Sequence, residues 1–514
     1  MRAVFVALFL LLAPGAAHAE WLQTSSAHFV IYSEDSLGNA RKFSERLERY
    51  HSALELVTGT KFVAPSPSNR VTIYVVDNQQ QVRRLAGAKS RYLAGFYIPR
   101  AGASMAIIPR VSSGSGTDLD FSMITLLHEY AHHFMYSSSN FQMPRWYAEG
   151  GAEFFSSARF DNKGGVGLGM PAQHRAAELF YASDVTATDL LDPEEYQRRR
   201  GKSSGYDAYY GKSWLMFHYL VFEQKRASQL QTYLRLISTG KSLREAGLEA
   251  FGDFAVLERE LDAYLRRSRV TYFNLPPSML QTGSIEVRKL TPGEAAILPV
   301  RMQSHRGVDK EQAAEVVASA REIAGRFPAD AAVQTALAEA EFDFGNDDAT
   351  VAAADAALKL DPKQANAYVQ KGYALFRQAE TSSSPDAFTK ARAPFVALNH
   401  IENDHPLPLL YFYLSFVKQG LKPTPLAVQG LERASELAPF DLGLRMTVAM
   451  QEIRDRRFDR ARQNLAPIAY NPHGGSLAES AQKVIDRLDA NPDWDGSDVA
   501  VDGNLEGDKE DEGS

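Results

Sequence analysis

An apolar stretch from Phe121 to Ser138 places the strongest restriction on how this chain can fold. Its apolar residues recur at helical spacing, which predicts a helix with one face packed against other elements. The stripe consists of Ile124, Leu127, Ala131, Phe134 and Met135. Glu129 is the only carboxylate between Phe121 and Pro144, and this interval holds no Lys or Arg. A lone acid in such an apolar helix is costly to bury, which suggests that it is kept for a function.

The middle of this stretch reads His128-Glu129-x-x-His132. Residues four apart lie one above the other on a helix, so His128 and His132 face the same way. Two imidazole nitrogens can then bind one Zn²⁺, and Glu129 is placed to take a proton from a zinc-activated water. The alternative is a chance match in which both histidines are ordinary residues of a core helix.

The N-terminal sequence and the absence of cysteine bear on where the protein is located. Met1-Arg2, the apolar run Ala3 to Leu12 and the small residues near Ala19 are typical of a signal peptide over residues 1–19. An uncleaved anchor is the alternative. After cleavage no stretch is long and apolar enough to span a membrane. The chain has no cysteine, which excludes disulfides and thiolate metal sites. We therefore expect a periplasmic or secreted protein.

The net charge of −7 does not suggest a nucleic-acid partner. Much of this charge lies in the final segment, residues 491–514, which is acidic and poor in apolar residues. Such a composition predicts a disordered tail.

Residues 20–270 alternate strand and helix patterns, and we expect them to form one domain. A small mixed sheet is expected before the helix at Phe121, and Thr117 or Asp118 could cap that helix. The predicted elements are strands at His28–Ser33 and Val71–Asp77, helices at Ser36–Val57 and Asn78–Leu85, and a hairpin formed by Ala94–Ile98 and Ser104–Ile108.

A second helix is expected after Pro144, a residue that suits a helix start. Glu149 and Glu153 again lie four residues apart on it. A catalytic zinc usually has three protein ligands, and Glu149 is the better candidate for the third, since His133 points about 100° away from His132. Glu153 could accept a hydrogen bond from a ligand histidine and fix its tautomer. The alternative for this pair is a solvated acidic face.

Residues 271–307 are expected to form a linker with a β-hairpin around Thr291-Pro292-Gly293. From 308 to 490 the chain is helical and alanine-rich, and prolines recur at turn-like sites with spacings of 34, 44, 33 and 33 residues. A period near 34 indicates two-helix repeats of the tetratricopeptide type. Small residues stand where helices must approach closely, although Thr350 and Thr447 depart from this pattern. An ordinary helical bundle is the alternative.

The motif His128-Glu129-x-x-His132 followed by Trp146-x-x-Glu149-Gly150-x-Ala152 resembles the gluzincin peptidases, especially the aminopeptidase-N-like branch. The resemblance covers roughly residues 21–267. It implies an α+β, thermolysin-like zincin domain with Zn²⁺ and with Glu149 as third ligand. Tyr210 corresponds to the tyrosine that stabilises the oxyanion in these enzymes, although Ser213 replaces a glycine of that motif.

Sequence alone therefore predicts a secreted or periplasmic zinc peptidase with an α-helical tetratricopeptide-like solenoid behind it. The substrate would be a peptide or protein, and the repeats could bind a protein partner. Aminopeptidases of this kind hold the substrate amine with a glutamate, but Ala106 stands at that position. We therefore expect an endopeptidase whose substrate pairs with the strand near Ala106, unless Glu153 binds the amine. The rival is a non-hydrolytic zinc-fold protein that recruits partners.

Overall fold

The computed structural model describes residues 20–87, 93–111, 119–138, 143–181, 185–200, 208–382, 384, 386–471, 473–491 and 493–496. The expected signal peptide, the capping residues Thr117 and Asp118 and nearly all of the acidic tail lie outside these ranges. No helix within the described ranges is both long enough and apolar enough to cross a membrane.

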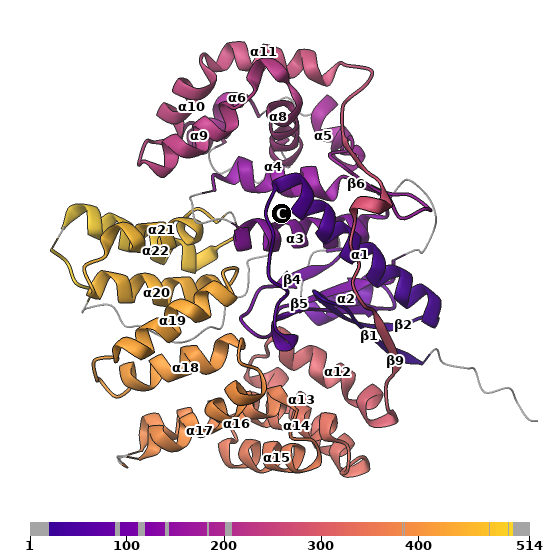
Figure 1. Ribbon diagram of the computed structural model, residues 1–514, viewed down its shortest axis with the longest axis vertical. Helices are drawn as coiled ribbons and strands as arrows, with labels where there is room; N and C mark the ends of the chain where they lie inside the picture. Colours follow the sequence, from indigo (N-terminus) through magenta and orange to yellow (C-terminus); the bar gives the residue numbers. More distant parts are fainter. Residues whose placement is uncertain are drawn as a thin grey trace, which may run out of the picture.

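A six-stranded mixed sheet lies at the centre of the molecule, in the order β4-β5-β3-β2-β1-β9 (Figure 1). Strands β2, β3 and β5 run parallel, and the outer pairs are antiparallel. The expected hairpin around Gly102 is confirmed as the β4–β5 pair. The strands are β1 (Trp21–Ser25), β2 (Phe29–Glu34), β3 (Val71–Val76), β4 (Phe96–Ile98), β5 (Met105–Pro109) and β9 (Glu286–Lys289).

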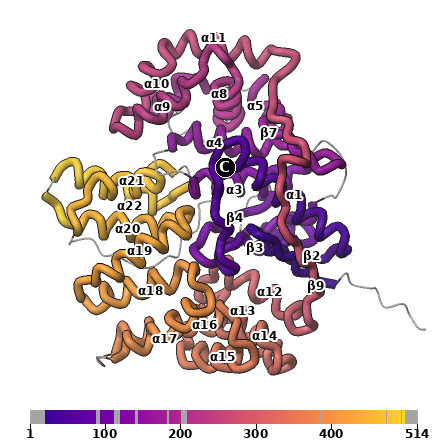
Figure 2. Tube along the Cα trace, viewed as in Figure 1, coloured from indigo at the N-terminus to yellow at the C-terminus, as the bar shows by residue number. Residues whose placement is uncertain are grey.

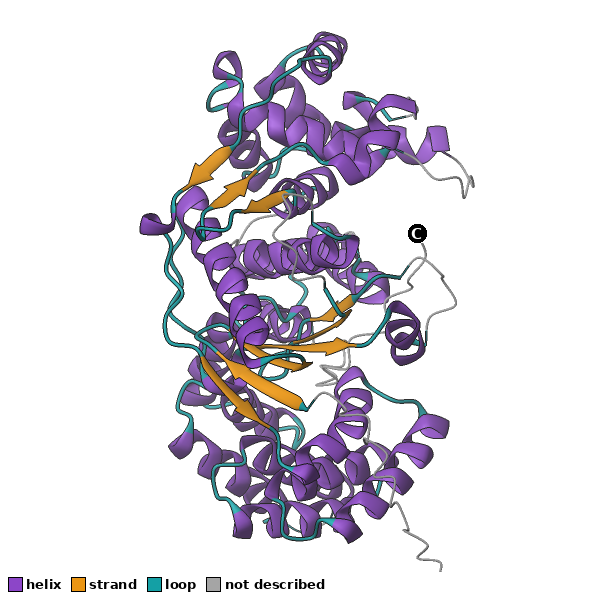
Figure 3. Cartoon of the chain, turned by 90° about the vertical axis from the view of Figure 1, so that its right-hand side faces the viewer, coloured by secondary structure: helices purple, strands orange, loops and turns teal. Residues whose placement is uncertain are grey.

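Helices cover both faces of this sheet (Figure 3). Alternate residues of a strand point to opposite faces, so Phe29 and Ile31 of β2 join the core with α1 (Leu37–Thr58) and α3 (Phe121–Ser138). Val30 and Tyr32 face α2 (Gln79–Ala86) and α12 (Pro292–Arg306) in a second core. A strand buried on both faces reads as a continuous apolar run, as the sequence of β2 does.

The predicted helix over Phe121 to Ser138 is confirmed as α3, which is followed by α4 (Arg145–Ser156) and α8 (Tyr209–Phe222). Asp120 caps α3, since its Oδ1 accepts the amide of Met123 at 2.8 Å. Helix α4 lies between α3 and α8, and its two glycines permit the close approach. A Cβ on Gly150 would come within 2.5 Å of the Ser213 carbonyl oxygen, and one on Gly151 within 2.7 Å of the Met135 methyl carbon.

The remaining elements between α4 and β8 lie above and beside α4 (Figure 1). A three-stranded antiparallel sheet has the order β6-β7-β8. These elements are β6 (Ala158–Phe160), β7 (Val166–Leu168), β8 (Phe273–Leu275), α5 (Ala176–Tyr181), α6 (Ala187–Leu191), α7 (Pro193–Arg200), α9 (Gln229–Ser238), α10 (Leu243–Phe251) and α11 (Phe254–Leu265).

The C-terminal helices form antiparallel pairs, as the proline spacing predicts. Helices α14, α16 and α20 begin three residues after Pro328, Pro362 and Pro439, and α18 begins at Pro406. They are α13 (Lys310–Arg326), α14 (Ala331–Phe344), α15 (Asp347–Leu360), α16 (Ala365–Thr381), α17 (Ala387–Ile401), α18 (Pro406–Val417), α19 (Pro425–Leu437), α20 (Leu442–Arg454), α21 (Phe458–Ala469) and α22 (Gly475–Ala490).

Close contacts between these helices explain their small residues. A Cβ on Gly372 would lie 2.4 Å from the ring of Phe395. Thr350 and Thr447, which departed from the small-residue pattern, are buried with their hydroxyl groups donating to the carbonyls of Asn346 and Gly443. Each hydroxyl thus has an acceptor within its own helix, so both threonines fit a packed position.

The row of repeat helices curves back towards the N-terminal part of the chain, so that α20, α21 and α22 lie beside α3 (Figures 1 and 2). The amide of Ala101 donates to Asp441 Oδ2 at 2.8 Å, and the side chain of Asn69 donates to the Leu437 carbonyl at 2.7 Å. The ring of Phe440 packs on that of His133, with centroids 4.3 Å apart. The repeats therefore contact the helix that carries the histidine motif.

Two expectations about strands are wrong. No hairpin forms around Thr291, because β9 pairs with β1 and the second expected strand lies inside α12. The Thr-Pro-Gly-Glu sequence reads as a turn but is a helix start: Thr291 and Glu294 form a capping box, with Pro292 at the first helical position. The strand near Ala106, β5, is paired with β3 and β4 on its two sides. It has no free edge for a peptide, and the outer strand here is β4.

Candidate metal centre

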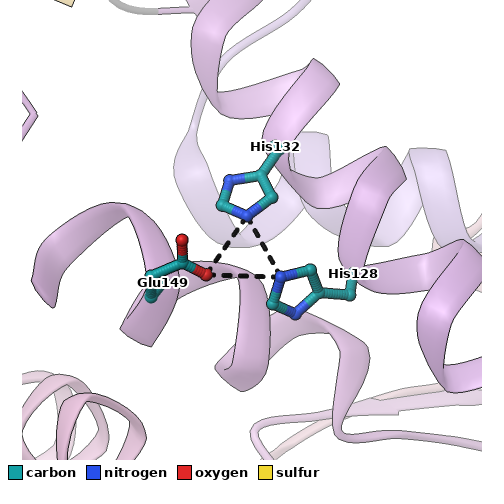
Figure 4. Close-up of side chains that lie close together, drawn as sticks. All are labelled: His128, His132 and Glu149. Carbon is teal, nitrogen blue, oxygen red and sulfur yellow. Dashed lines mark hydrogen bonds and ion pairs between the residues drawn. The ribbon is translucent and has the colours of Figure 1, made fainter. Parts of the chain in front are cut away.

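Helices α3 and α4 bring two histidines and one glutamate together in the interior (Figure 4). We call His128, His132 and Glu149 the triad. His128 and His132 lie one turn apart on α3, and Glu149 faces them from α4. The Nε2 atoms of the two histidines are 3.1 Å apart. Glu149 Oε2 lies 3.4 Å from Nε2 of His128 and 3.5 Å from Nε2 of His132.

These distances fit a metal ion. Ligand atoms about 2.0–2.1 Å from a tetrahedral zinc are about 3.3 Å from one another. The three atoms of the group are separated by 3.1, 3.4 and 3.5 Å. The group could therefore hold a metal ion with little rearrangement, and the donor set of two imidazoles and one carboxylate suits zinc.

The state of Glu149 supports the same interpretation. Its side chain is 0% exposed, Oε1 contacts His473 Nε2 at 2.9 Å, and Oε2 has no hydrogen-bond partner in the described part of the chain. The distances to His128 and His132 are longer than those of a charge-assisted hydrogen bond. A buried carboxylate is costly unless a cation or donor compensates it. A bound metal would supply that compensation.

Glu153 orients the first histidine of the group. Its Oε1 lies 3.2 Å from His128 Nδ1, on the side of the ring opposite the triad. An Nδ1–H directed at this carboxylate leaves the Nε2 lone pair for a metal. Glu153 is 1% exposed and also contacts His174 at 2.6 Å and Arg175 at 2.7 Å. The expected contact between Glu153 and a motif histidine is present.

The charges around the triad are strongly coupled. Burial alone would lower the pKa of His128, but its contacts with Glu149 and Glu153 raise it to about 10. Burial would raise the pKa of Glu149, but the charges of His473 and His132 hold it well below its usual range. The carboxylates thus create a negative field at the triad, which favours a divalent cation as it favours a proton.

The two predicted catalytic residues lie on α3 and α8. Glu129 is half-buried and has no hydrogen bond or ion pair within the residues that the structure describes. Tyr210, in the first turn of α8, has its ring centroid 6.4 Å from that of His128. The charge of Glu149 and burial both raise the pKa of Tyr210. Its phenol therefore keeps its proton at neutral pH.

His133 is separate from the group, as its angular position predicts. Its Nδ1 lies 2.6 Å from the hydroxyl of Tyr97 on β4. Three other residues of the site had no motif around them in the sequence: His174, Arg175 and His473. The first two hold Glu153, and Nε2 of His473 lies 2.9 Å from Glu149 Oε1. These contacts join segments that are distant in the chain, and no local spacing indicates them.

Comparison with known proteins finds a family model that matches part of the chain. A family model described as "Protein of unknown function (DUF1570)" matches residues 122–244. This range contains all of α3 but its first residue, together with α4 and α8, and therefore the whole triad. No curated protein matches the chain.

The C-terminal helices are similar to solved tetratricopeptide structures. A thermophilic TPR protein of Thermus thermophilus is 13% identical, with a TM-score of 0.31, over 37% of this chain and 93% of that one. The MamA RS-1 ArsTM double mutant is 15% identical, with a TM-score of 0.27, over 37% of this chain and 97% of that one.

Proposed function

We propose that this protein is a zinc-dependent peptidase of the gluzincin type. One observation carries the proposal: the Nε2 atoms of His128 and His132 and one oxygen of Glu149 lie 3.1–3.5 Å apart in a buried site. These residues would hold Zn²⁺, which when bound activates a water molecule and polarises a carbonyl group.

The surrounding side chains have the chemistry for peptide hydrolysis. Glu129 is the general base: it takes a proton from the attacking water and delivers it to the leaving amine. Tyr210 donates a hydrogen bond to the carbonyl oxygen as negative charge develops there. Its raised pKa suits this role, because the donor must stay protonated. Glu153 and Arg175 hold the ring of His128 in place through charged contacts.

We infer endopeptidase rather than aminopeptidase activity. Ala106 on β5 offers no charge to a substrate amine. Glu153, the alternative anchor, already contacts His128, His174 and Arg175 through its two oxygens. An extended peptide would instead lie along the outer edge of β4, which pairs with no further strand in the described part of the chain and which the Tyr97–His133 contact ties to α3. The proposed location, the periplasm or the cell exterior, rests on the N-terminal sequence alone.

The test measures metal and hydrolysis separately. The wild-type protein should hold one zinc per chain, and His132→Ala should empty the site. Glu129→Gln should keep the zinc and abolish cleavage, because an amide cannot accept the proton. A library of free and N-acetylated peptides should yield internal cuts in both forms. Zinc binding without cleavage of any peptide or protein substrate would favour the non-hydrolytic alternative, and full zinc content in His132→Ala would refute the ligand assignment.

A further inference from the structure

The last repeats contact the two helices of the metal centre, α3 and α4, at three points. Arg445 of α20 is buried and donates from Nη2 to the carbonyl of Tyr136 at 2.9 Å. Tyr136 lies in the last turn of α3, where helical carbonyls lack partners and a positive charge is favourable. The hydroxyl of Tyr136 donates to Asn471 Oδ1 at 3.3 Å. The repeats thus hold the end of the helix that carries both motif histidines.

The third contact reaches Glu149 itself. His473 lies between α21 and α22, and its Nε2 is 2.9 Å from Glu149 Oε1. The two motif histidines lie nearest the other oxygen, Oε2. The ring of His473 also meets the ring of His132 edge-on, with centroids 5.8 Å apart. One oxygen of the carboxylate therefore faces the metal position, and the other faces an imidazole from the repeats.

We propose that His473 is a positioning residue for the metal ligand Glu149, and that it couples metal binding to docking of the last repeat pair. A ligating carboxylate needs a hydrogen-bond donor on its free oxygen to fix its orientation. Glu153 of α4 is such a partner for His128, whereas the partner of Glu149 is His473, which comes from the repeats. This inference rests on the proposed zinc centre and does not depend on peptidase chemistry.

The coupling works in both directions. A docked His473 holds Glu149 in the orientation that binds zinc, so docking raises the affinity for zinc. By linkage, bound zinc must stabilise the docked repeats by the same factor. The side chain of His473 is 41% exposed, so its replacement leaves the packed core of the repeats intact.

The first experiment measures zinc affinity of the full chain by competition with a chromophoric chelator at fixed pH. Loss of an outer partner of a metal ligand lowers affinity about 10–100-fold, and we expect about tenfold for His473→Ala because the histidine is partly exposed. His473→Gln keeps an N–H donor at similar reach and should restore most of the affinity. His400→Ala, which removes an exposed histidine of α17, is the matched control and should bind zinc as the wild type does.

The second experiment measures amide hydrogen exchange in α22 with and without zinc. Zinc should slow exchange there in the wild type and in His473→Gln, but not in His473→Ala. Equal zinc affinity of His473→Ala and the wild type, or equal losses in the Ala and Gln variants, would overturn the role of His473. An exchange rate in α22 of the wild type that does not change with zinc would overturn the coupling. A wild-type protein that binds no zinc would refute the proposed centre as a whole, which is a distinguishable result.

Discussion

The contact between Glu153 and His128 allows a quantitative test of how the metal centre is held. Glu153→Gln keeps the shape of the side chain but removes its charge. The Nδ1 of His128 then faces a neutral amide instead of a carboxylate at 3.2 Å. The ring loses basicity and orientation together. Changes at such outer partners lower metal affinity about 10–100-fold, equivalent to about 1.4–2.7 kcal/mol.

The fold should tolerate this change better than a simple count of ion pairs suggests. Arg175 loses the charge of Glu153 but keeps Glu178, whose Oε1 lies 2.8 Å from Nη1. No cation is therefore left buried without a partner, which is the situation that destabilises most. We expect the circular-dichroism spectrum to match that of the wild type while the zinc affinity falls.

Glu178→Gln is the matched control for this assay. Glu178 is as buried as Glu153 and pairs with the same arginine, but its other oxygen accepts the amide of Gly211 at 2.7 Å rather than a motif histidine. Chelator competition should therefore give a wild-type affinity for the control and a weakened one for Glu153→Gln. Equal affinities in all three proteins, or equal losses in both variants, would refute the reasoning.

Two further predictions concern packing and pH. Gly150→Ala places a methyl group 2.5 Å from the backbone oxygen of Ser213, so we expect about 1–3 kcal/mol of destabilisation in a urea titration; an unchanged midpoint would contradict this. Burial lowers the pKa of His405 from 6.5 to about 4. The contribution of His405 to the free energy of unfolding is therefore fully present above pH 6.5. It falls by about 3 kcal/mol in all as the pH drops towards 4, because the unfolded chain binds a proton first. His405→Asn, which can still cap α18, should unfold with a weaker dependence on pH in this window, and identical profiles would show that His405 does not titrate there.

The parts that the sequence predicted correctly depend on local spacing. A helix fixes the relation between His128 and His132, and the pattern on α4 fixes that between Glu149 and Glu153. The prolines mark the helix pairs for the same reason, because each one ends or begins a helix within its own neighbourhood.

The parts that it missed depend on contacts between distant segments. Nothing near His473 distinguishes it from other histidines, since its role arises from the curvature of the whole repeat row. The error at Thr291 has another origin: Thr-Pro-Gly is compatible with both a turn and a capped helix start. Only Glu294 decides between them, through its bond to the Thr291 amide at 2.8 Å.

The pairing of β9 with β1 has a consequence for the solubility of shortened chains. Strand β9 is one edge strand of the central sheet, and its charged residues Glu286, Arg288 and Lys289 are exposed. A short, charged border strand discourages pairing with other molecules. A chain cut near residue 270 would lose this cover and leave β1, which has no charged residue, as the bare border. Such a fragment would offer an open row of amide and carbonyl groups to its neighbours, and should aggregate even though His128, His132 and Glu149 were all still present.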